Sequence, residues 1–226
     1  MKRSREDDAS APSAGISEAS VGIAAFRSEA VEPAHPTGIF AMRWADFHVR
    51  EISGTDGLPL ALTDVPKDGS SVPQSEVISF VMYKENRTTA DALMQLAGAS
   101  GCPFGAFAVA GSKDRRAVTV QQVTARRLRD PARLLRINEK WTSSGSRVRV
   151  GHFATASRPL DLSSARGNRF VVVLREVELI DSHEKPKANE PGIAAPERPP
   201  DELLRAACEA TARHICVRGF VNYFGM

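Results

Sequence analysis

The stretch at residues 107–121 constrains the fold of this chain more than any other part of the sequence. It begins with an apolar run, passes through a charged segment, and ends in a run where Val118 and Val120 alternate with smaller or polar side chains. Alternation with a period of two is typical of a strand. Two strand-type runs around a short polar segment predict a hairpin with a tight turn. That turn would present Lys113 and Asp114 at the end of a sheet.

Strand-type runs outnumber helical ones along the rest of the chain. Runs rich in β-branched and aromatic residues occur at residues 39–43, 47–52, 77–83, 147–153 and 169–179, the last with an apolar core at 171–174. Helical patterns with start signals occur at residues 88–97, 132–140 and 202–218. The last helix would bury Leu203, Leu204, Ala207, Cys208 and Ile215. Because helices and strands do not alternate regularly, the sequence predicts an α+β fold, with a mixed, mostly antiparallel sheet and packed helices.

Composition divides the chain into a tail and a folded part. Residues 1–37 have few large apolar side chains, which predicts a disordered N-terminal tail. Residues 38–226 are expected to form one domain, interrupted by a proline-rich loop at 181–200. No apolar run approaches the length that spans a bilayer, so no membrane partner is expected. Three cysteines and five histidines show no metal-ligand spacing, so no metal site is expected either.

Positive charge is concentrated in the middle of the sequence. The whole chain has a net charge of +3, whereas residues 113–149 contain eleven Lys or Arg and three Asp or Glu, a net charge of +8. Such a block is typical of a surface that contacts a phosphate backbone. It is equally typical of a solvated face, and charge alone does not separate the two.

Asp114 is the candidate for chemistry in this block. Its neighbours Lys113, Arg115 and Arg116 favour the ionised form of the carboxyl group. A carboxylate held among phosphate-binding side chains is placed to act as a nucleophile or base on a polyanion. An Asp in a turn more often satisfies local backbone donors, so the pattern by itself favours the structural role.

The segment Gly111-Ser-Lys-Asp-Arg-Arg-Ala-Val-Thr-Val-Gln121 resembles the signature of the TruD family of pseudouridine synthases. Three more stretches match that family in the same order: Asp46-Phe-His-Val-Arg-Glu51, Gly167-Asn-Arg-Phe170 and Gly219-Phe-Val-Asn-Tyr-Phe-Gly225. The resemblance runs from about residue 38 to the last residue. Four motifs in order are far more specific than one.

The resemblance implies a pseudouridine synthase-like catalytic domain that isomerises uridine to pseudouridine in RNA, with tRNA as the expected substrate and no cofactor. It assigns catalysis to Asp114. Lys113 and Arg115 would keep this carboxyl group anionic and anchor phosphates. Three cysteines without a paired spacing favour a reducing compartment, so an intracellular protein of the nucleus or cytoplasm is expected, and the sequence leaves the oligomeric state open.

A flipped uridine needs a wall on which to stack. The family motifs assign that wall to Phe47 and Phe170, although aromatic side chains on strands are more often core residues. Asn168 would hydrogen-bond near Asp114 or the base edge. Glu51 would pair with a basic neighbour and fix the loop.

Two departures from the family pattern bear on activity. Ala41 stands where the family usually carries a Lys, and the chain stops at the motif after which the family continues. The chain is therefore expected to correspond to the first part of such an enzyme. A catalytically incomplete RNA-binding fragment is the alternative. A carboxylate-dependent hydrolase is disfavoured, since no second acid has a convincing spacing from Asp114.

Overall fold

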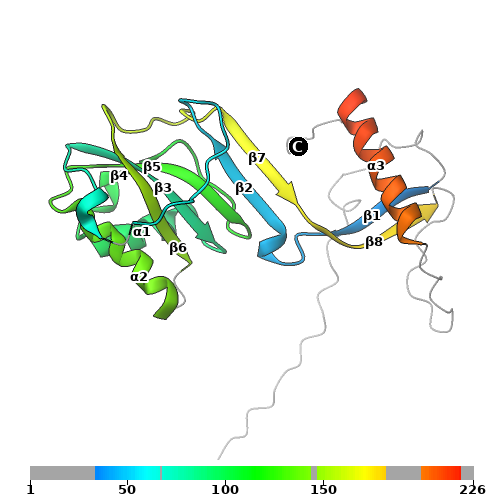
Figure 1. Ribbon diagram of the computed structural model, residues 1–226, viewed down its shortest axis with the longest axis horizontal. Helices are drawn as coiled ribbons and strands as arrows, with labels where there is room; N and C mark the ends of the chain where they lie inside the picture. Colours follow the sequence, from blue (N-terminus) through cyan, green and yellow to red (C-terminus); the bar gives the residue numbers. More distant parts are fainter. Residues whose placement is uncertain (1–33, 67, 144–146, 182–199, 220–226) are drawn as a thin grey trace, which may run out of the picture. The chain divides into compact units, whose positions relative to one another are not determined.

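The structure is a computed structural model that describes residues 34–66, 68–143, 147–181 and 200–219. The chain divides into two compact units, residues 38–177 and the residues on either side of them. The first unit holds the larger sheet and the helices packed on it (Figure 1). The predicted tail at 1–37 and the predicted loop at 181–200 lie largely outside the described residues, and the first described element, β1 (Ala34–Phe40), starts within the predicted tail.

Six strands form the main sheet. Five follow the order β6-β3-β5-β2-β7, and a short strand pairs with β5 off this path. The strands are β2 (Phe47–Ile52), β3 (Val77–Glu85), β4 (Phe107–Val109), β5 (Val118–Arg126), β6 (Val148–Thr155) and β7 (Gly167–Val172). Strands β2 and β5 are parallel, whereas the other pairs are antiparallel. The α+β fold with a mixed, mostly antiparallel sheet is therefore confirmed.

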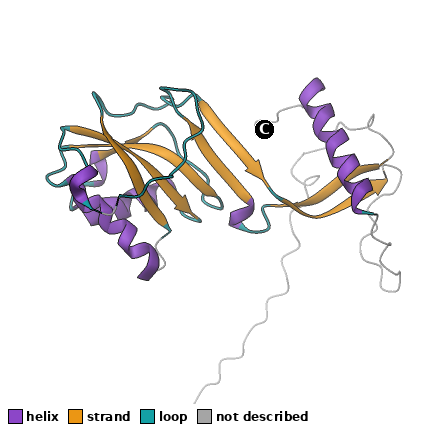
Figure 2. Cartoon of the chain, in the orientation of Figure 1, coloured by secondary structure: helices purple, strands orange, loops and turns teal. Residues whose placement is uncertain are grey.

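Helices α1 (Thr89–Ser100) and α2 (Arg136–Ser143) cover one face of this sheet (Figures 1 and 2). Thr88 caps the N-terminus of α1 by accepting a hydrogen bond from the Asp91 amide, as the sequence predicts. A short 3₁₀ helix, Pro131–Leu135, precedes α2. Apolar side chains of these helices and of β3, β5 and β6 form the core, with Phe80, Leu96, Leu134 and Ile137 at most 1% exposed.

Three expectations about strands are wrong. The run at 169–179 is not one strand, because it divides into β7 and β8 (Leu174–Asp181), and β8 pairs with β1 (Ala34–Phe40) in a separate two-stranded sheet. Its expected core at 171–174 is 39–50% exposed, because it spans the end of β7, an edge strand of the main sheet, and the start of β8. The hairpin β4–β5 is present, but residues 110–117 form a longer loop rather than a tight turn.

The last helix, α3 (Asp201–Arg218), begins and ends close to its predicted bounds, with Gly219 at its C-terminal end. Leu204 is buried, Ala207 and Cys208 are half-buried, and Leu203 and Ile215 are exposed, so the predicted inward face is wrong for the last two. No helix among the described residues has the length and apolar character to cross a membrane.

Candidate active site

The loop at residues 110–117 carries the predicted catalytic acid. It connects β4 to β5, and the side chains of Asp114, Arg115 and Arg116 are exposed. Lys113 differs from its neighbours because its side chain is only 7% exposed. The loop therefore presents one carboxylate and two guanidinium groups to solvent while it anchors itself through Lys113.

Lys113 is anchored by Glu51. Its Nζ lies 2.8 Å from Oε2 of Glu51, whose side chain is 2% exposed, and Oε1 of Glu51 accepts a hydrogen bond from the Gln122 amide at 3.1 Å. Among the described residues, no ion pair joins Lys113 to Asp114. Lys113 thus fastens the loop to strand β2, and its expected effect on the ionisation of Asp114 stays a prediction.

Strand register places several polar side chains on one face of the sheet. Glu51 lies opposite Asn168, Val49 opposite Phe170 and Thr119, and Thr119 opposite Lys84. Residues in register on neighbouring strands project to the same face. Phe80, Met82 and Lys84 are every second residue of β3, so their side chains project to the same face. Phe80 and Met82 belong to the core, so this is also the face that the helices cover. Polar groups therefore continue the apolar core toward the loop.

Thr89 and Gln121 hold the loop from two sides. The Lys113 amide donates to Oγ1 of Thr89 at 2.9 Å, and the side-chain amide of Gln121 donates to the Gly111 carbonyl at 3.1 Å. Thr89 and Gln121 also contact each other, with Oγ1 donating to Oε1 at 3.3 Å. The first residue of α1 and a central strand residue thus fix the loop backbone.

Lys84, at the end of β3, is fully buried with 0% exposure. Its Nζ donates to the carbonyl groups of Arg87, Lys113 and Asp114 at 2.8, 3.2 and 2.7 Å. Burial lowers the pKa of Lys84 to about 8, and the nearby charge of Asp114 opposes that shift. Sequence reasoning missed this residue. The only signal was a Lys directly after an apolar strand, where the strand was expected to end.

Phe47 and Phe170 stack on each other. Their ring centroids are 5.8 Å apart with an interplanar angle of 4°, and Phe170 is 54% exposed. Phe47 is half-buried and also contacts Phe40 edge to face. The exposed side chain of Asn168 comes from the same strand as Phe170. The two aromatic residues singled out from the sequence are therefore in contact, and one of them offers ring surface to solvent.

No hydrogen bond joins Asn168 to Asp114 within the described part of the chain. The structure thus brings together Phe47 with Phe170 and Lys113 with Glu51, and it leaves the side chains of Asp114, Arg115 and Asn168 exposed on their loop and strand.

Asp46 fixes the start of β2. Its carboxylate is 1% exposed and receives two hydrogen bonds from Arg175, at 2.7 and 2.8 Å, and a third from the Arg43 amide at 2.9 Å. The Arg175 hydrogen bond is the main cause that lowers the pKa of Asp46 to about 2. This ion pair holds the turn that precedes Phe47.

A pocket of about 830 Å³ lies beside the loop. Its lining consists of Met42, Arg43, Trp44, Ala45, Asn86, Arg115 and Arg116. The Arg116 guanidinium donates to the Met42 carbonyl at 2.8 Å, and the Arg147 guanidinium lies 4.7 Å from the centre of the Trp44 ring. Arginine and an aromatic ring are the groups that contact phosphates and bases in RNA.

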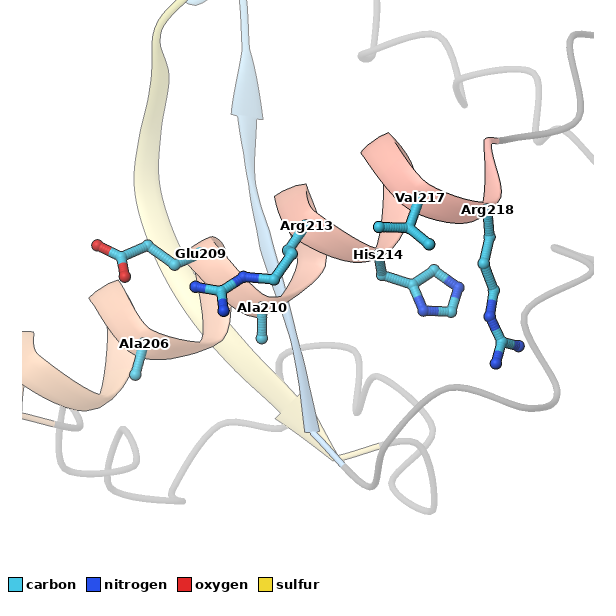
Figure 3. Close-up of a pocket in the computed structure, with 7 residues that line it drawn as sticks. All are labelled: Ala206, Glu209, Ala210, Arg213, His214, Val217 and Arg218. Carbon is cyan, nitrogen blue, oxygen red and sulfur yellow. The ribbon is translucent and has the colours of Figure 1, made fainter.

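A second hollow, of about 520 Å³, belongs to the other unit. It is lined by one side of α3 (Figure 3): Ala206, Glu209, Ala210, Arg213, His214, Val217 and Arg218. None of these residues belongs to the sequence motifs. Among the described residues, no group of three or more His, Cys, Asp or Glu side chains is placed to hold a metal ion.

Comparison with known proteins finds relatives that are named as pseudouridine synthases. The sequence model described as tRNA pseudouridine synthase D (TruD) matches residues 34–226. Pseudouridylate synthase 7 homolog of Mus musculus is 29% identical over 147 residues, which cover 65% of this chain and 18% of the mouse protein. Multisubstrate pseudouridine synthase 7 of Schizosaccharomyces pombe is 30% identical over 152 residues, 67% of this chain and 19% of the yeast protein.

An archaeal relative and a solved structure agree with these matches. A probable tRNA pseudouridine synthase D of Pyrobaculum islandicum is 31% identical over 148 residues, 65% of this chain and 32% of that protein. The crystal structure of a putative tRNA pseudouridine synthase D from Methanosarcina mazei superposes with a TM-score of 0.55 at 20% identity, covering 83% of this chain and 34% of the other.

The likeness to the archaeal crystal structure shows a fold found in pseudouridine synthases. Since the family model covers most of its length, the chain belongs to the TruD family of pseudouridine synthases. It spans between 18% and 32% of the length of the relatives compared above.

Proposed function

We propose that this chain carries the catalytic aspartate of an RNA pseudouridine synthase and that its substrate is tRNA. The observation that carries the proposal is the position of Asp114, an exposed acid on a loop whose backbone is fixed by buried side chains. Membership of the TruD family supplies the reaction class.

The reaction rearranges one nucleotide. The bond between C1′ of the sugar and N1 of uracil breaks, the base turns over, and C1′ bonds to C5. The proton lost from C5 is balanced by a proton gained at N1, so no group is added and no electrons are transferred. Such an isomerisation requires a positioned carboxylate but no cofactor.

Asp114 would act on the sugar as an anion. Its carboxylate either attacks C1′ or removes a sugar proton, and both routes require the ionised form. Arg115 lies next to it in sequence and is exposed, so it is available to hold a flanking phosphate. Lys113 and Glu51 would act indirectly, by holding the loop.

The target base has to leave its stack before C1′ becomes accessible. The partly exposed ring of Phe170, supported from behind by Phe47, supports a role as the surface on which the flipped base rests. Asn168 on the same strand has an exposed amide group that can read the edge of a base.

Arginines around the nearby pocket support binding of the RNA backbone. Arg43, Arg115 and Arg116 line it together with Trp44, which combines phosphate-binding groups with a stacking surface. This pocket is the place where we expect nucleotides next to the target uridine to lie.

One observation favours the alternative, an RNA-binding chain without a complete catalytic pocket. Edge strand β7 and the residue after it expose an apolar run from Phe170 to Val173. A pocket that shields a flipped base normally has such side chains covered.

The two functions separate in one assay. The chain is incubated with unmodified tRNA, and pseudouridine is measured beside the dissociation constant at several salt concentrations. Product formation supports the enzyme. Salt-sensitive binding without product supports the RNA-binding alternative, and the absence of both contradicts the proposal. A single-stranded RNA without tRNA structure tests the choice of substrate.

A further inference from the structure

The buried ammonium of Lys84 contacts the backbone on both sides of Asp114. An ammonium has three hydrogens to donate, and Lys84 directs them at three carbonyl groups, those of Arg87, Lys113 and Asp114. The last two belong to the peptide groups that flank the Cα atom of Asp114. Rotation of either peptide group would redirect the carboxylate.

Because Lys84 is buried, its ammonium group is restricted to these three acceptors. Lys84 is 0% exposed, and its neighbours on β5 and β6 in the sheet register are Thr119 and Val148, which carry no charge. A buried ammonium without partners is costly, so the side chain is held to its carbonyl acceptors. The same hydrogen bonds restrict the loop to positions in which its carbonyl groups contact the Lys84 ammonium.

We propose that Lys84 is a positioning residue for Asp114, which fixes the two peptide groups around the catalytic acid and places a positive charge beneath it. The inference rests on the proposed function in so far as Asp114 is the catalytic group. It adds a residue that acts through the loop backbone and makes no contact with the RNA.

Because the ammonium of Lys84 can lose a proton, we expect the order of the loop to depend on pH. Its pKa is lowered to about 8, mainly by burial, with Asp114 opposing the shift and Lys113 adding to it. Arg87 approaches through its carbonyl group, and the uncharged Thr89 of α1 contacts the Lys113 carbonyl, which is one of the acceptors of Lys84. A neutral amine has two hydrogens, so deprotonation releases one carbonyl group and removes the charge near Asp114.

The test replaces Lys84 with Met, which keeps the length of the side chain and removes its donors. Ile78→Ala is the matched control, because Ile78 is a buried core residue of the same strand and the same face. Amide hydrogen exchange is measured for a peptide covering residues 110–117, together with kcat and KM for pseudouridine formation. The Lys113 and Ala117 amides are hydrogen-bonded in the structure and report on the loop.

Lys84→Met is expected to speed exchange in the loop and to lower kcat by about 100-fold, with KM changed by less than about threefold, because the acid is misplaced while the RNA surface is intact. Ile78→Ala should leave loop exchange and the kcat of the folded molecules unchanged. A folded Lys84→Met protein with unchanged loop exchange overturns the proposal, whether or not the chain is active. An inactive unmodified chain counts against the proposed function, and the exchange result still decides the role of Lys84.

If Lys84→Met does not fold, hydrogen exchange of the unmodified protein at different pH values tests the proposal. After correction for intrinsic exchange rates, protection of the loop should decrease as the pH rises through about 8, while core peptides stay protected. Loop protection that is independent of pH over that range overturns the proposal.

Discussion

The ammonium of Lys113 and the carboxylate of Glu51 form a buried ion pair of 2.8 Å that ties the loop of Asp114 to strand β2. The same strand carries Phe47, which stacks on Phe170. The acid and the aromatic surface are therefore connected through one short chain of contacts. In the sequence, strand β3, helix α1 and strand β4 separate the two partners of the ion pair.

Removing one partner of this ion pair should destabilise the fold. Glu51→Gln leaves the Lys113 ammonium buried without an anion, which typically costs about 3–5 kcal/mol. Urea denaturation measures the free energy of unfolding. The exposed pair Arg127–Glu76, with side chains 82% and 75% exposed, provides the control. Glu76→Gln should change the free energy of unfolding by less than about 0.5 kcal/mol, since exposed pairs contribute little. Equal effects of the two substitutions would contradict the buried anchor.

Acid should weaken the contact between Asp46 and Arg175. The pKa of Asp46 is about 2 in the folded chain and 3.8 in the unfolded reference, so the unfolded state binds the proton first as the pH falls. The stabilisation is present above about pH 4 and is lost as the pH falls through about 2. A melting-temperature titration between these values should be flatter for Asp46→Asn. Identical slopes for the variant and the unmodified chain would exclude the effect.

Phe170→Ala should lower the activity on RNA more than it lowers the stability of the fold. Stacking on an aromatic ring contributes about 1–3 kcal/mol per base, so kcat/KM should fall by about tenfold or more. Because Phe170 is 54% exposed, the free energy of unfolding should change by about 1 kcal/mol or less. Phe104→Ala removes an aromatic ring that is 48% exposed elsewhere and serves as the control. An unchanged kcat/KM in Phe170→Ala would show that its ring does not receive a base.

Arg115 and Arg116 should contribute to RNA affinity by binding phosphates. Removing one arginine that binds a phosphate should reduce the slope of log affinity against log salt by about 0.7–0.9. Arg116→Gln is the sharper variant, because its guanidinium lines the pocket and is oriented by the Met42 carbonyl. Arg136→Gln, an exposed arginine at the start of α2, is the comparison. Equal slopes for all three proteins would remove the pocket from the RNA interface.

Local sequence patterns predicted most strands and helices of the main unit. Strand β2 has the bounds that its alternating pattern predicts, and Thr88 caps α1 as expected. Failures occurred where tertiary position decides exposure. The apolar run 171–174 has the composition of a buried strand, but it spans the end of edge strand β7 and the start of β8, where its side chains are exposed.

The site was predictable to the extent that motifs mark it. The family signatures singled out both rings of the aromatic stack and both partners of the ion pair, but not which residues meet. Adjacency in the sequence shows that Lys113 lies near Asp114, whereas its ion pair with Glu51 depends on the fold that brings the loop against strand β2. Lys84 belongs to none of the motifs quoted above, and its role depends on carbonyl groups 29 and 30 residues further along the chain.

The central claim, that Asp114 performs the chemistry, is tested most directly by single-turnover pseudouridine formation in tRNA with Asp114→Asn. Asp130→Asn is the matched control, since Asp130 is another exposed acid of the basic segment, and its side chain makes no capping hydrogen bond to the helix that follows it. Asp114→Asn is expected to lower the rate by at least about 100-fold, while its RNA affinity and melting temperature stay close to those of the control. A rate within a few-fold of the control would contradict the claim.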